Sequence, residues 1–195
     1  MSLNNIAGFQ SETGDREGAL KTAREAVELH RKLAQANPAA YTPDWAMSLN
    51  NLANRQSETG DREGALNTAR EAVELRRKLA QANPAAYTPD WAASLNNLAN
   101  RQSETGDREG ALKTAREAVE LRRKLAQANP AAYTPDWAKS LCVFAMACAS
   151  GGRLPDGIVA AKEAVALLEP FAEQSPAAFG RLLQAATQLR DRLLA

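Results

Sequence analysis

The chain contains very few of the residues on which several common classes of protein depend. It has one histidine among 195 residues, His30, which argues against a multi-histidine metal site and against a histidine-based catalytic relay. The only two cysteines, Cys142 and Cys148, are too few for a disulfide framework. On a helix their spacing places them about 120° apart, where they cannot bond to each other. We therefore expect a non-enzymatic protein with no catalytic residue, no metal and no cofactor.

Long apolar runs and an excess of one charge are also lacking. No apolar run approaches the ~20 residues of a transmembrane helix. The first residues have no basic region followed by an apolar core, so they do not resemble a secretory signal. Lys and Arg total 24 and Asp and Glu total 23, which gives a net charge of +1. We expect a cytoplasmic protein with no general attraction to nucleic acid or to a membrane.

The chain is, by contrast, rich in alanine and in internal repetition. Residues 48–93 and 94–139 differ at only two of 46 positions, and residues 2–47 differ from 48–93 at six. A fourth, diverged copy begins at Ser140. Such a period is typical of repeat architectures. The sequence predicts a single repeat domain over residues 1–195, with repeats at 2–47, 48–93, 94–139 and 140–179 and a capping helix at 180–195.

Each repeat is predicted to contain two helices, as the second repeat illustrates. Helix A begins at Pro43, with Thr42 as its N-cap, and ends before Gly60, which supplies a left-handed stop. Helix B begins after Asp61 and ends before Asn83-Pro84. Each helix has an apolar face that it cannot bury alone. Stacked hairpins can bury both faces, so we predict an all-α solenoid of antiparallel helix pairs.

The spacing of small and apolar residues in each repeat resembles that of the tetratricopeptide repeat. In the second repeat this spacing is carried by Leu49, Leu52, Ala53, Gly60, Ala65 and Ala72. The string Ser48–Ala53, followed by Gly60, Glu63 and Ala65, is more specifically similar to the long repeats of kinesin light chains and of bacterial signalling proteins. The resemblance implies a right-handed α-solenoid whose concave groove is lined by helix A.

Three positions depart from the pattern of that family. Gln56 stands where the family usually has an aromatic residue, and Ala69 where it often has a large one. Arg77 replaces the proline that usually ends the second helix, which fits a longer helix B. We expect a less bulky core, compensated by the tryptophans that recur at Trp45, Trp91 and Trp137.

A stripe of asparagines lies opposite the apolar face of helix A. An amide offers donors and an acceptor, so a ladder of amides could hold the backbone of an extended peptide. In similar tetratricopeptide proteins the second asparagine of the motif contacts peptide backbone, which maps here to Asn5, Asn51 and Asn97. Alternatively, the stripe only solvates the face or bonds neighbouring helices. The other members of the stripe are Asn4, Asn50, Asn96, Asn54 and Asn100.

The fourth repeat replaces this stripe by apolar residues. Cys142, Val143 and Met146 replace the aligned asparagines, so this end of the groove could form a pocket for an apolar anchor of the partner. Alternatively, a chain end folds over this surface, or the fourth repeat is a degenerate stop.

Arg76 and Arg122 fall inside the apolar arc of helix B, where His30 stands in the first repeat. We expect each arginine to lay its stem along apolar surface with its head free, or to stack on a tryptophan of the next repeat.

The resulting hypothesis is a protein–protein interaction module that holds an extended peptide or a partner helix in the concave groove. The alternative is a self-assembling or structural spacer array without a groove ligand. Near-identical repeats stack readily, and the first helix A is cut short, so end-to-end homo-oligomers are possible. Both hypotheses are compatible with a consensus-like sequence or a piece of a larger signalling protein.

Overall fold

The structure, a computed structural model, describes residues 2–195, and in that part it consists of helices and short turns without a strand. It divides into two compact units, one ending at Thr105 and one beginning at Gly106. The N-terminal unit contains α1 (Leu3–Glu12), α2 (Arg16–Ala36), α3 (Pro38–Glu58), α4 (Arg62–Ala82) and α5 (Pro84–Glu104). The C-terminal unit contains α6 (Arg108–Ala128), α7 (Pro130–Ser150), α8 (Leu154–Gln174) and α9 (Pro176–Leu194).

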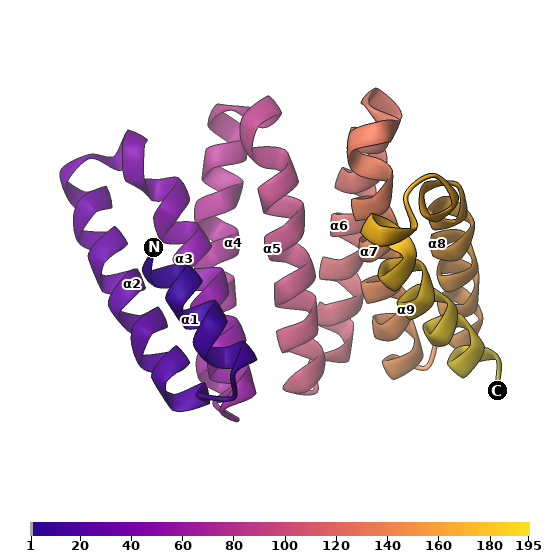
Figure 1. Ribbon diagram of the computed structural model, residues 1–195, viewed down its shortest axis with the longest axis horizontal. Coiled ribbons are helices and arrows are strands. Elements are labelled where there is room, and N and C mark those ends of the chain that lie inside the picture. The colour runs from indigo at the N-terminus through magenta and orange to yellow at the C-terminus, as the bar shows by residue number, and fades with distance from the viewer. Residues whose placement is uncertain (1) are drawn as a thin grey trace. The chain divides into compact units, whose positions relative to one another are not determined.

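Within each unit every helix packs against the helix that follows it in the chain (Figure 1). The odd-numbered helices are helices A of the repeats, and the even-numbered ones are helices B. Helix α3 also contacts α1 and α5, and α7 also contacts α9, so helices A of successive repeats touch within a unit. This arrangement confirms the predicted all-α stack of helix pairs. The predicted single domain over residues 1–195 stays a prediction.

Equal helix lengths keep the repeat in register. Helices α2 to α8 each contain 21 residues. A single asparagine, such as Asn83, separates α4 from α5. Its backbone N–H donates to the Leu79 carbonyl at 2.9 Å, and its side chain accepts from the Ala86 N–H at 3.3 Å. One residue thus ends helix B, as predicted, and begins the next helix A.

The predicted start of helix A was wrong. Helix α3 begins at Pro38 with Asn37 as its N-cap, and Pro43 lies inside the helix. The hydroxyl of Thr42 donates to the Pro38 carbonyl at 2.7 Å and caps nothing. A proline in the early turns removes only one backbone hydrogen bond, so the helix continues through it. The final helix begins at Pro176, four residues before the predicted start, because this proline occupies its first turn.

The turn between helices A and B is held by side chains of its own repeat. Gly60 has a φ of 87°, the left-handed conformation that the sequence predicts. Asp61 accepts from the Gly64 N–H at 2.9 Å and from Nε2 of Gln56 at 3.1 Å. Gln56, which replaces the aromatic residue usual in the family, therefore fixes the helix B cap rather than filling the core.

Alanine forms much of the buried surface. In the N-terminal unit, alanines of both helices are fully covered, including Ala46, Ala53, Ala65, Ala69 and Ala72. In the C-terminal unit a cluster with larger residues surrounds Leu168, which is also fully buried. Small side chains allow the axes of neighbouring helices to approach closely.

The arginines in the apolar arc of helix B are buried, but their heads are not free, contrary to the expectation from the sequence. Arg76 is 6% exposed, and its Nη1 lies 2.7 Å from Oδ2 of Asp90 on α5. Arg122 pairs with Asp136 on α7 at 3.0 Å. Burial lowers the pKa of Arg76, and the charge of Asp90 opposes that shift. These ion pairs tie helix B to the next helix A.

We predict that Gly60→Ala lowers the free energy of unfolding by about 1–2 kcal/mol, because alanine is strained at this positive φ. The matched control is Gly8→Ala in the interior of α1, where an added Cβ meets no atom within 4 Å. That change should stabilise by about 0.5–1 kcal/mol. Urea denaturation measures both, and equal effects of the two substitutions would contradict the assignment.

We also predict that Asp90→Ala destabilises more than Arg76→Met. The first change leaves a buried guanidinium without its carboxylate and should cost about 1–3 kcal/mol. The second removes the charge and keeps an apolar stem, at an expected cost below about 1 kcal/mol. Glu74→Ala, which removes the exposed partner of Arg77, is the control and should change stability by less than about 0.5 kcal/mol. The reverse order of the two main variants in urea denaturation would disprove this account.

Candidate functional site

In the first two asparagine pairs, the first member joins two helices A of the N-terminal unit. Nδ2 of Asn4 donates to Oγ of Ser48 at 3.0 Å, and Nδ2 of Asn50 donates to Oγ of Ser94 at 2.7 Å. Both bonds link a helix A to the helix A of the next repeat. The donor groups of these two asparagines are therefore engaged within the stack.

The second asparagine of each pair is differently placed. Asn5 is exposed and Asn51 is half-buried, and neither side chain makes a hydrogen bond within residues 2–195. Nδ2 of Asn97 makes a long contact of 3.4 Å with Oδ1 of Asn50. Among the remaining members of the stripe, three are half-buried: Asn54, Asn96 and Asn100. Amides thus recur along the face of helices A, and those of Asn5 and Asn51 are unengaged.

A second set of hydrogen bonds joins successive repeats at the C-terminal ends of helices A. Oγ of Ser11 donates to Glu58, and Oγ of Ser57 donates to Glu104, both at 2.8 Å. Glu58 also pairs with Arg55 at 3.0 Å. The carboxylates at this position therefore serve the joint between repeats.

The C-terminal unit has an apolar pocket of about 390 Å³ between α7 and α9. Cys142 and Met146 line it from α7, and the α9 residues include Leu182 and Leu189. Val143 is half-buried and is not among the lining residues. Helix α9 thus packs beside the apolar surface of the fourth repeat and leaves Met146 38% exposed.

Burial raises the pKa of the Cys142 thiol to about 11. The thiol is therefore protonated at neutral pH and is a poor nucleophile. The pocket offers apolar contact rather than covalent chemistry.

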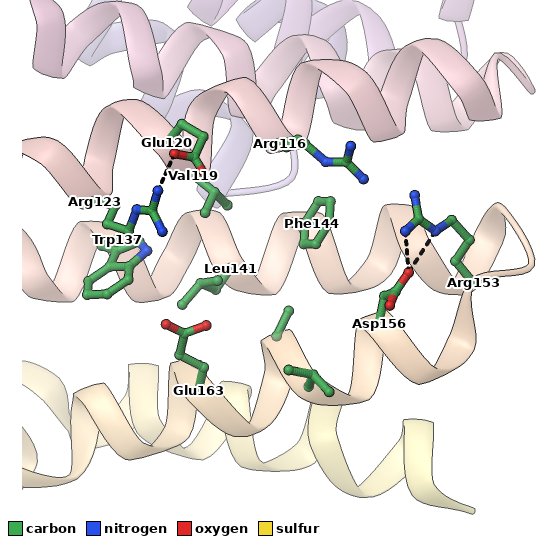
Figure 2. A pocket seen from close by; sticks show the side chains of 12 residues that line it. Arg116, Val119, Glu120, Arg123, Trp137, Leu141, Phe144, Arg153, Asp156 and Glu163 are labelled. Carbon is green, nitrogen blue, oxygen red and sulfur yellow. Dashed lines mark hydrogen bonds and ion pairs between the residues drawn. The ribbon is translucent and has the colours of Figure 1, made fainter.

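A second cavity, of about 340 Å³, opens between α6, α7 and α8 (Figure 2). Leu141 and Phe144 of α7 lie between the charged side chains of α6 and α8. The guanidinium of Arg116 lies over the Phe144 ring, 5.7 Å from its centroid. Sequence reasoning did not identify this cavity. The available signal was a group of departures from the repeat in its fourth copy: Phe144 for leucine, Arg153 for aspartate, Asp156 for glycine and Val159 for lysine.

These sites can bind a ligand through hydrogen bonds and apolar contacts. No group of three or more His, Cys, Asp or Glu residues that could hold a metal ion occurs within residues 2–195. In the same part of the chain, no helix combines the length and apolarity needed to cross a membrane.

Solved structures share the fold at low identity. Two crystal structures of a Podosopora anserina protein, described as a kinesin light chain with nearly identical TPR-like repeats, are similar. The first, of a form with one substitution, has a TM-score of 0.71 at 16% identity, covering 98% of this chain and 91% of that one. The other has a TM-score of 0.69 at 17% identity, covering 99% and 90%.

BtubC (BKLC) from P. vanneervenii is also similar, with a TM-score of 0.60 and 19% identity over 80% of this chain. This chain spans 57% of its length. No curated protein matches the sequence significantly. The family model of the tetratricopeptide repeat matches residues 1–39, 45–85 and 91–131, which together exceed half of the chain. The chain therefore belongs to the tetratricopeptide repeat family.

Proposed function

We propose that the face of helices A in the N-terminal unit binds an extended segment of a protein partner, with Asn5, Asn51 and Asn97 as contacts to its backbone. Tetratricopeptide repeats are generally protein-interaction modules. The module binds without carrying out a reaction. We place it in the cytoplasm, where the thiols of Cys142 and Cys148 would stay reduced.

The different roles of the two asparagines in each of the first two pairs are the observation that supports this proposal most directly. Asn4 and Asn50 hold neighbouring helices together through Ser48 and Ser94. Asn5 and Asn51 are adjacent in sequence to these residues and have no side-chain partner within residues 2–195. A polar face whose only role was to solvate the stack would not need an amide at this position in each of the first three repeats.

The chemistry of an amide suits backbone recognition. Each asparagine can donate to a peptide carbonyl and accept from a peptide N–H, whatever the side chains of the ligand. Neighbouring helices pack about 8–10 Å apart, and an extended chain rises ~3.3 Å per residue. Successive asparagines would therefore meet the ligand at about every third residue. Selectivity for the amino-acid sequence of the ligand must therefore come from other contacts.

In the C-terminal unit, the pocket beside Met146 would receive an apolar side chain of a partner. Met146 has a flexible, polarizable side chain that adapts to different shapes. The apolar residues of α7 and α9 that line the pocket support this role.

We predict that replacing Asn5, Asn51 and Asn97 together with alanine weakens binding by about a hundredfold. Each neutral hydrogen bond contributes about 1 kcal/mol, and 1.4 kcal/mol corresponds to a factor of ten in affinity. Peptides selected from a display library on the unmodified chain supply the ligand. Isothermal titration calorimetry then compares the variants.

Two controls separate binding from folding. Asn67→Ala removes an exposed amide from helix α4 and should leave affinity unchanged. Asn50→Ala removes the bond to Ser94 and should lower the unfolding midpoint. Affinity equal to that of the unmodified chain in the triple variant would overturn the assignment of these asparagines.

A further inference from the structure

The cavity between α6, α7 and α8 combines an apolar wall with six charged side chains (Figure 2). Its volume of about 340 Å³ is within the range of small-molecule sites. Two of its apolar residues, Trp137 and Phe144, are aromatic. The lining residues lie on these three helices and at the turn before α8, so neither the first nor the last helix of the chain takes part.

Four of the six charged side chains pair with each other. Arg123 pairs with Glu120 at 2.6 Å, and both residues belong to α6. At the start of α8, Nε of Arg153 donates to Asp156 at 2.7 Å. Each pair joins one positive and one negative charge. These two pairs therefore give the cavity no preference for an anion or for a cation.

The other two charged side chains have opposite signs and lie on different helices. Arg116 of α6 contacts the face of the Phe144 ring and has no carboxylate partner within residues 2–195. Glu163 of α8 makes no hydrogen bond or ion pair in the same part of the chain. Leu141 and Phe144 of α7 lie between them (Figure 2). The cavity thus has one unpaired cation and one unpaired anion, separated by apolar side chains.

The unpaired carboxylate follows from a substitution in the fourth repeat. In the third repeat, Lys113 precedes Glu117 by four residues, a spacing at which the two side chains are neighbours on a helix. In the fourth repeat the aligned residues are Val159 and Glu163, so the lysine is lost and the carboxylate is kept. Val159 lines the cavity and is 65% exposed. An apolar side chain therefore replaces the nearest basic residue of the repeat pattern.

We propose that this cavity binds a short peptide with free termini, two or three residues long and with apolar side chains. The carboxylate of the peptide contacts Arg116, its ammonium group contacts Glu163, and its side chains lie against Trp137 and Phe144. A free amino acid fits less well, because its two charges are attached to the same carbon. An extended peptide rises ~3.3 Å per residue, so a second or third residue separates the two charges further.

Both unpaired charges are needed for this choice of ligand. A guanidinium binds a carboxylate through two parallel hydrogen bonds, and a carboxylate accepts hydrogen bonds from an ammonium group. A ligand with only one charge would leave either Arg116 or Glu163 without a partner. The inference goes beyond the proposed function and does not rest on it, because Asn5, Asn51 and Asn97 belong to the N-terminal unit.

An NMR titration of the full chain with the dipeptide phenylalanyl-leucine tests the site. The indole N–H signal of Trp137 reports on the cavity, and those of Trp45 and Trp91, in the N-terminal unit, are internal controls. Only the Trp137 signal should shift. The absence of a shift up to the solubility limit of the dipeptide would overturn the proposal, and so would equal shifts of all three signals.

Dipeptides with one blocked end assign the two contacts. Amidation of the carboxylate and acetylation of the amino group should each weaken binding by about fivefold, the upper range for an exposed ion pair. Arg116→Gln should abolish the effect of amidation and keep that of acetylation, and Glu163→Gln should do the reverse. A residue with a merely structural role would weaken the free and blocked dipeptides equally, and that result would overturn the assignment.

The residues adjacent to these two provide matched controls. Glu117 follows Arg116, Lys162 precedes Glu163, and both are exposed and outside the lining of the cavity. Glu117→Gln and Lys162→Gln should therefore change the affinity for the free dipeptide by less than about twofold. A loss of affinity in both controls as large as in the main variants would mean that charge acts only in a general way, and the proposed contacts would be wrong.

Discussion

Close contact between alanine-lined helices is the constraint on which the rest of this structure depends. Ala46, Ala53, Ala65 and their equivalents are fully covered, and their small side chains bring the helix axes together. Each contact removes little apolar area from water, so stability has to accumulate over many similar joints. Equal helices of 21 residues and one-residue asparagine linkers repeat the same joint in register.

Polar contacts between repeats follow from this close packing. With axes near each other, short side chains such as Asn50 and Ser94 can bond across neighbouring helices A. The buried arginine of helix B likewise reaches an aspartate of the next helix A. These polar contacts determine which helices pack against each other. The small alanine side chains allow the axes of those helices to come close together. Asn5 and Asn51, the second members of the first two asparagine pairs, are left out of this network within residues 2–195.

The sequence was sufficient to predict the helix pairing, the left-handed glycine and the end of helix B, because local signals determine them. The predicted start of helix A was wrong because Pro43 was taken as its first residue, whereas Asn37 caps the helix at Pro38. The partners of Arg76 and Asn50 lie on other helices, so periodicity alone could not identify them. The cavity near Phe144 is formed by three helices, so the sequence could not show it. The residues of the fourth repeat that differ from the other repeats and line this cavity were visible in the sequence.

In the first two asparagine pairs, Asn4 and Asn50 hold neighbouring helices A together, whereas Asn5 and Asn51 have no side-chain partner within residues 2–195. Hydrogen exchange of the side-chain amides, followed by NMR, tests it most directly. We predict slower exchange at Nδ2 of Asn4 and Asn50, which donate to serines, than at Nδ2 of Asn5 and Asn51. Equal exchange rates within each pair would contradict it.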